Sequence, residues 1–199
     1  MKKILLLVSM LLMITNVSFA MQGIVEVQTI NGVMPGMSRS EVLAAWGEPL
    51  AEKDVFAYFK PGGLQAMFRT SDNPKGVVYL RDITAKNNPQ LVLQPSGIAI
   101  GMTKDEIISR LGEPDRISYG HFDDGSSYYS TDIIIYHTPE YINFANQKGN
   151  EDIELYVNVD TNRLVAITLQ GYFRIPFQWP TENTKTKVKN KKKVDNGLG

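Results

Sequence analysis

Two histidines and a pair of aspartates are the residues of this chain whose types could support hydrolytic or metal chemistry. His121 and His137 lie on successive predicted strands, and Asp123 and Asp124 follow the first of them. Imidazole and carboxylate groups bind catalytic zinc and act as general bases. Two histidines on strands are more often ordinary sheet residues, and the sequence has no cysteine to add a thiolate. We therefore predict no metal site and no cofactor.

Other catalytic patterns are weak or missing. The turn at residues 123–127 lacks the alternating oxygen ligands and the final glutamate of a calcium loop. Glu48 and Glu113 recur between glycine and proline, but nothing nearby indicates the desolvation that an acid/base pair needs. The sequence contains no G-x-S-x-G elbow, H-E-x-x-H helix or phosphate loop. We predict that the protein is not an enzyme, and a hydrolase using His121 or His137 is the least favoured alternative.

The elements that would position these residues form an internal repeat. Residues 32–49 align with residues 97–114 at an offset of 65, and seven of the eighteen aligned positions are identical. Most of the other aligned pairs are conservative, such as Ser38 with Thr103. Chance is a poor explanation, so the chain is predicted to contain two copies of one unit.

Each copy begins with the signature of a short helix. Ser38 and Glu41 are spaced as a capping box, in which the two residues cap the first turn reciprocally. Apolar residues then recur on one helical face, and a glycine followed by a proline ends the helix. The second copy has the same pattern, with these counterparts in the order cap, box and apolar face: Thr103, Glu106, Ile107, Ile108 and Leu111.

After each helix the apolar period changes from near 3.6 to two, which is typical of strands. We predict an α+β fold, a tandem repeat of a short helix followed by an antiparallel β-meander, with the helices on one face of the sheet and the other face open. The predicted strands are residues 54–60, 64–70 and 77–83 in the first copy, and 116–122, 127–137, 152–159 and 163–171 in the second.

The ends of the chain differ from its middle. Residues 1–20 have the lysines, apolar run and small residues of a secretory signal peptide, with cleavage predicted near Ala20. Residues 21–96 and 97–180 are the two predicted repeats. Residues 181–199 are lysine-rich and polar, and are predicted to be a disordered tail. The mature protein is therefore expected to be periplasmic or secreted.

Charge is segregated along the chain. Residues 21–180 contain 13 basic and 19 acidic side chains, whereas the tail contains six lysines. A net negative folded part argues against nucleic acid as a partner. Weak contact of the tail with anionic lipid is an alternative to a merely solvated end. An envelope structural or assembly protein tethered by this tail is accordingly the main alternative function.

The pattern G-M-[ST]-x-x-E-[VI]-[LI]-x-x-[WL]-G-x-P at residues 36–49 and 101–114 resembles the SmpA/OmlA (BamE-like) family of bacterial outer-membrane proteins. The strand, acidic turn and strand at residues 155–167 resemble that family's closing hairpin. Two such units in tandem are similar to β-lactamase inhibitory protein, whose concave sheet binds a protein. The resemblance implies structural roles for the motif residues. It also departs from the family's single-unit lipoproteins, because this chain has two units and no cysteine to lipidate.

These observations predict an exported, non-enzymatic protein-binding module of the cell envelope. Its binding surface is expected to be the sheet face that the helices leave open, because a helix-covered face is filled by core residues. Tyrosine and arginine are enriched in binding hot spots. With the predicted strand alternation, the partner-binding residues are expected to be Tyr58, Arg69, Tyr79, Arg81, Tyr128, Asp132, Glu154 and Tyr156.

Overall fold

The computed structural model describes residues 25–70, 78–123, 125–143 and 146–174 of the chain. The predicted signal peptide and the lysine-rich tail lie outside these residues. The described strands of the main sheet are β2 (Ala51–Lys53), β3 (Phe56–Phe59), β4 (Leu64–Thr70), β5 (Val78–Lys86), β7 (Arg116–Asp123), β8 (Tyr128–His137), β9 (Tyr141–Ile142), β10 (Lys148–Asn158) and β11 (Arg163–Arg174).

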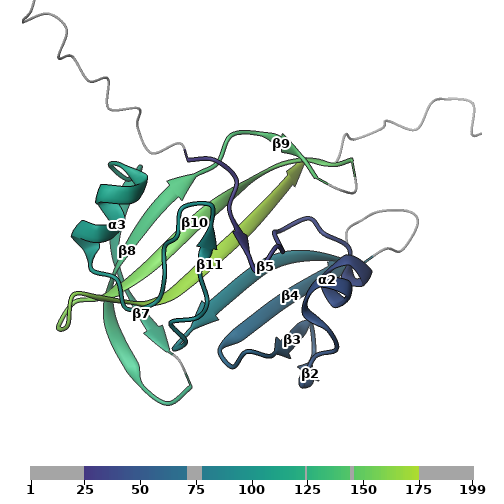
Figure 1. Ribbon diagram of the computed structural model, residues 1–199, viewed down its shortest axis with the longest axis horizontal. Coiled ribbons are helices and arrows are strands. Elements are labelled where there is room, and N and C mark those ends of the chain that lie inside the picture. The colour runs from purple at the N-terminus through teal and green to yellow at the C-terminus, as the bar shows by residue number, and fades with distance from the viewer. Residues whose placement is uncertain (1–24, 71–77, 124, 144–145, 175–199) are drawn as a thin grey trace, which may run out of the picture.

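These nine strands form one antiparallel sheet (Figure 1). Its spatial order is β2-β3-β4-β5-β11-β10-β8-β7, and β9 pairs with β10. A separate two-stranded ribbon consists of β1 (Thr29–Ile30) and β6 (Leu93–Gln94). Neither strand of this ribbon was predicted from the sequence, since each has only two residues and no alternation to detect.

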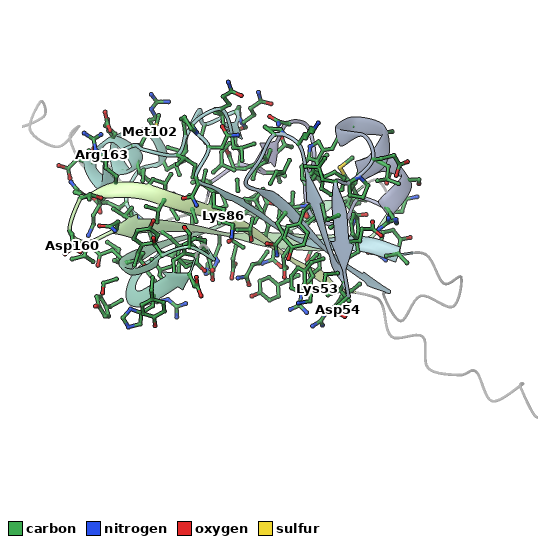
Figure 2. All side chains as sticks on the ribbon, turned by 90° about the horizontal axis from the view of Figure 1, so that it is seen from below. Lys53, Asp54, Lys86, Met102, Asp160 and Arg163 are labelled. Carbon is green, nitrogen blue, oxygen red and sulfur yellow. The ribbon has the colours of Figure 1, made fainter. Side chains whose placement is uncertain are left out.

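Two helices, α2 (Arg39–Trp46) and α3 (Lys104–Leu111), lie on the same side of the sheet as the ribbon (Figures 1 and 2). Both predicted capping boxes are confirmed. The backbone N–H of Ser38 donates to Glu41 Oε2 at 2.7 Å, and that of Thr103 donates to Glu106 Oε2 at the same distance. Each helix is eight residues long, so it depends on packing for its stability.

The caps make a testable contribution to stability. Replacing Ser38 or Thr103 with alanine removes the oxygen that accepts the N–H of the third helical residue. We expect each change to lower the free energy of unfolding by about 1 kcal/mol, as urea denaturation would measure. Ser109→Ala, on the exposed face of α3, is the control and should change stability by far less. Equal effects of all three changes would contradict the capping argument.

The predicted α+β fold of tandem helix-plus-meander units is wrong. About half of the described residues lie in strands and only about a tenth in helices, and all the described strands except β1 and β6 form one large antiparallel sheet. β5 from the first half of the chain pairs with β11 from the second half, in the register Thr84 opposite Thr168. Local periodicity predicts single strands but not which strand edges join. Here the edge strands β5 and β11 hydrogen-bond to each other through their backbones, so the two halves of the chain share one sheet.

The core lies between the sheet and the elements that cover one of its faces, which are the two helices and the β1–β6 ribbon. Val42 of α2 and Ile107 of α3 are fully buried, as are Ile30 and Leu93 of the small ribbon. Trp46 packs edge-on against Phe59, with ring centroids 5.2 Å apart. The residues of β3 and β10 that point toward the helices are buried, whereas Val55, in the turn after β2, is 45% exposed. The buried ones are Ala57, Phe59, Ile153, Leu155 and Val157.

Candidate functional site

The face of the sheet away from the helices, here called the open face, follows from the strand register. Directly opposed residues in antiparallel strands point to the same side. On β10, Ile153 and Leu155 are fully buried toward the helices, so Glu154 and Tyr156 point to the open face. Glu154 is opposed by Thr168 on β11 and by Ile135 on β8. The open face therefore continues across all the central strands.

Most of the predicted partner-binding residues lie on this face. Arg69 and Tyr79 oppose each other on β4 and β5, and Tyr58 opposes Gln65 across β3 and β4. Arg81 occupies the irregular position where the β4–β5 register shifts. Its Nε lies 3.6 Å from Asp82 Oδ1. The residues of the prediction that share the open face are therefore Tyr58, Arg69, Tyr79, Glu154 and Tyr156, with Arg81 beside them.

Tyr128 and Asp132 were placed on the wrong face. Asp132 opposes Tyr119, on the helix side of the sheet, and Lys104 Nζ of α3 binds its Oδ2 at 3.0 Å. Tyr128 shares that side and stacks on His121. The alternation of β8 was misjudged by one residue, because this strand is apolar on both faces near its end. Tyr129, which opposes Phe122, holds the open-face position instead.

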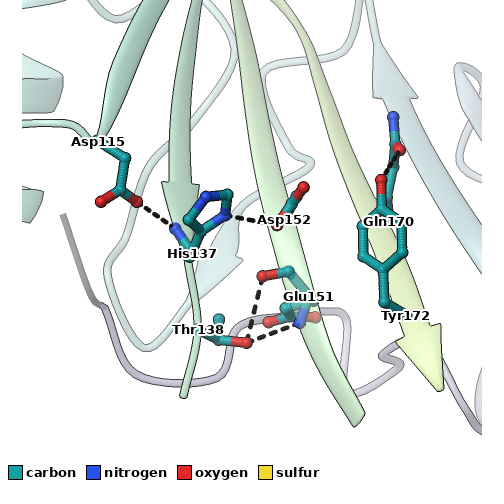
Figure 3. Close-up of polar contacts among 7 residues, drawn as sticks. All are labelled: Asp115, His137, Thr138, Glu151, Asp152, Gln170 and Tyr172. Atoms are coloured by element: carbon teal, nitrogen blue, oxygen red, sulfur yellow. Dashed lines mark hydrogen bonds and ion pairs between the residues drawn. The ribbon is translucent and has the colours of Figure 1, made fainter. Parts of the chain in front are cut away.

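Three pairs of polar side chains are in contact on the open face. Tyr156 Oη donates to Glu154 Oε2 at 2.6 Å, and Tyr172 Oη donates to Gln170 Oε1 at 3.1 Å. On β8, His137 Nδ1 lies 2.5 Å from Asp152 Oδ1. Figure 3 shows His137 of β8 in contact with Asp152 of β10, and Tyr172 in contact with Gln170 on the same strand, β11. These bonds restrict the orientations of the side chains that make them.

The open face carries charges of both signs in separate regions. Arg69 and Arg81 lie on the β4–β5 side, whereas Asp152 and Glu154 lie on β10. Asp82 sits between the two regions. Burial raises the pKa of its carboxyl to about 6, against the opposing effect of the two arginines, and the nearby Glu154 raises it further. The centre of the face is thus partly removed from water.

The residues that could support catalysis are not brought together. His137 opposes Asp152 on the open face, whereas His121 opposes Ser130 on the helix side. Glu48 and Glu113 each follow a helix and are exposed. Within the described parts of the chain, no group of three or more histidines and carboxylates could hold a metal ion.

Sequence reasoning missed one ionisable residue, Glu151. It points to the helix side of β10 and is fully buried, and burial raises the pKa of its carboxyl to about 7. Its Oε1 accepts the backbone N–H of Gln28 at 2.7 Å, while its Oε2 has no hydrogen-bond partner in the described structure. Its backbone pairs with Thr138. Glu151 shares the strand parity of Ile153, but the predicted strand began at residue 152 and so left it out.

A scan against protein-family models and searches of curated proteins and of solved structures found no match. The resemblance to the SmpA/OmlA family stays a prediction made from the repeated motif. Among the described residues, no helix has the length and apolar character needed to cross a membrane.

Proposed function

We propose that this protein is an exported, non-enzymatic module of the bacterial cell envelope that binds a protein partner through its open face. The observation that carries the proposal is the contrast between the two faces of the sheet. Both helices and the β1–β6 ribbon pack on one face, whereas no described element packs on the other (Figure 2). A sheet of this size with one bare, structured face is suited to bind another surface.

The composition of the open face supports a protein as the partner. Tyr58 is 38% exposed and Tyr172 is 44% exposed, so both rings offer area for contact. Tyrosine and arginine contribute large contact areas and adaptable hydrogen bonds in protein interfaces. The hydrogen bonds of Tyr156 and Tyr172 fix these side chains in advance, which lowers the entropy lost on binding.

The separation of positive and negative charges on the open face limits which partner surfaces would be complementary to it. A complementary partner would place acidic groups against Arg69 and Arg81, and basic groups against Asp152 and Glu154. A uniformly charged polymer would match one region and be repelled by the other. A folded protein with both signs on its surface fits this arrangement better than nucleic acid.

The test begins with capture of a partner from an envelope extract on the immobilised mature protein and continues with calorimetric titration of that purified partner. We expect Tyr58→Ala combined with Tyr156→Ala to raise the Kd by about 100-fold, because hot-spot residues contribute about 2 kcal/mol or more. Ser109→Arg, on the exposed side of α3, should leave the Kd unchanged.

Circular dichroism of both variants is required, since Tyr156 is half-buried. A folded double variant that binds with the affinity of the original chain would refute the open face as the site. Loss of binding on Ser109→Arg would assign the partner to the helix side instead.

A further inference from the structure

β7 is the last strand of the sheet, and its outer edge is unpaired among the described residues. This edge is eight residues long, whereas β2 at the opposite end has only three. Edge strands are usually protected by proline, lysine or a bulge, and β7 contains no proline or lysine and pairs with β8 in an unbroken register. The strand therefore offers a long row of backbone donors and acceptors.

Exposed aromatic rings lie beside this edge. Tyr119 is 66% exposed and Tyr128 is 69% exposed, and both point to the helix side of the sheet. His121 lies between them, with its ring centroid 5.5 Å from that of Tyr119 and 4.9 Å from that of Tyr128. Ile117, on the same side of β7, is 43% exposed. An apolar patch next to a bare strand edge marks an interaction surface.

We propose that β7 is a dimerisation edge, at which a second copy of this chain adds its own β7 in antiparallel orientation. The charged residues at the two ends of β7 favour a second copy of this chain as the partner. Arg116 stands at its first position and Asp123 at its last. Antiparallel pairing brings the basic end of each strand near the acidic end of the other, whereas parallel pairing would bring like ends together. Arg116 points to the open face and Asp123 to the helix side, so this attraction acts between the strand ends and not as a directly opposed ion pair. The strand is thus complementary to itself.

The aromatic rings support the same pairing. In a register with the twofold axis at Gly120, Tyr119 lies opposite the partner's His121, and the reverse contact follows by symmetry. Three rings from each copy then form one continuous cluster on the helix side of the joined sheet. Gly120 adds no side chain at the axis, and a Cβ there would come within 2.6 Å of Ile133 Cδ1 of its own chain. The joined edges leave both open faces free, so the inference is independent of the proposed function.

Sedimentation equilibrium of the purified mature protein across micromolar concentrations tests this inference. We expect a monomer–dimer equilibrium, together with slower hydrogen exchange of the β7 amides at high concentration. Tyr119→Lys places two like charges near the axis and should raise the dimer Kd by about 100-fold. Arg116→Glu should raise it by about threefold. Both side chains are exposed, so the fold should survive.

Lys53→Glu, a charge reversal on the opposite edge strand β2, is the matched control and should leave the dimer Kd unchanged. A chain that stays monomeric at all concentrations would overturn the proposal. A dimer that neither β7 variant weakens would also overturn it. The same holds for a monomer whose β7 amides become protected only when an extended peptide is added.

Discussion

Replacing Glu151 with glutamine is expected to raise the free energy of unfolding by roughly 3 kcal/mol at pH 8 and to leave it almost unchanged at pH 4. Burial raises the pKa of this carboxyl from 4.5 to about 7 in the folded protein. The folded-state pKa is above that of the unfolded chain, so the stabilising proton is fully bound below pH 4.5 and is lost as the pH rises through 7. Glutamine is uncharged throughout and keeps an oxygen for the N–H of Gln28.

Urea denaturation of both proteins between pH 4 and pH 8 measures this effect. The original chain should lose stability toward pH 8, and the variant should lose much less. Asp82, whose pKa burial raises to about 6, contributes in the same direction and keeps some pH dependence in the variant. Glu26→Gln, at an exposed position, is the control and should follow the original chain. Parallel pH profiles for Glu151→Gln and the original chain would show that Glu151 is ionised at little cost.

Replacing Gly63 with alanine is expected to lower the free energy of unfolding by about 2–5 kcal/mol. Gly63 has a φ of +87°, in the left-handed region that favours glycine. A Cβ at this position would lie 1.9 Å from the carbonyl oxygen of Lys86, whose N–H donates to the Gly63 oxygen at 3.0 Å. The new atom therefore disturbs the pairing of β4 with β5 as well as the turn.

The adjacent Gly62 provides the matched control. A Cβ there meets no atom within 4 Å, and its φ is not in the left-handed region. Gly62→Ala should change stability by less than about 0.5 kcal/mol. Thermal unfolding of the two variants side by side compares them. A similar loss from both changes would mean that the turn tolerates a side chain at Gly63.

Features set by neighbouring residues were predictable from the sequence. The capping boxes require only a hydroxyl and a glutamate three residues apart, and both helices begin where that spacing places them. Strand β4 begins at Leu64 and ends at Thr70, as its alternation predicts. A turn rich in glycine and proline bounds it on one side.

Features set by distant residues were not predictable in the same way. β2 has three residues, all exposed, so it carries no alternation. The pairing of β5 with β11 depends on two edges that are far apart in the chain. The face of Asp132 follows from its position opposite Tyr119 and from the ion pair with Lys104, neither of which local periodicity contains. The sequence therefore predicted that one face of the sheet is exposed, but two of the eight residues expected on that face lie on the other side.

The pairing of β5 with β11 also has a consequence for how the chain reaches its native state. Thr84 and Thr168, whose hydroxyl oxygens are 3.2 Å apart across this pair, are separated by 84 residues. Closing such a loop is slower than forming the hairpins on either side of it. β11 is also the last described strand, and it completes both β5 and β10. Because a chain is synthesised from its N-terminus, this sheet cannot close until β11 has been made, and β5 stays a bare, aggregation-prone edge until then.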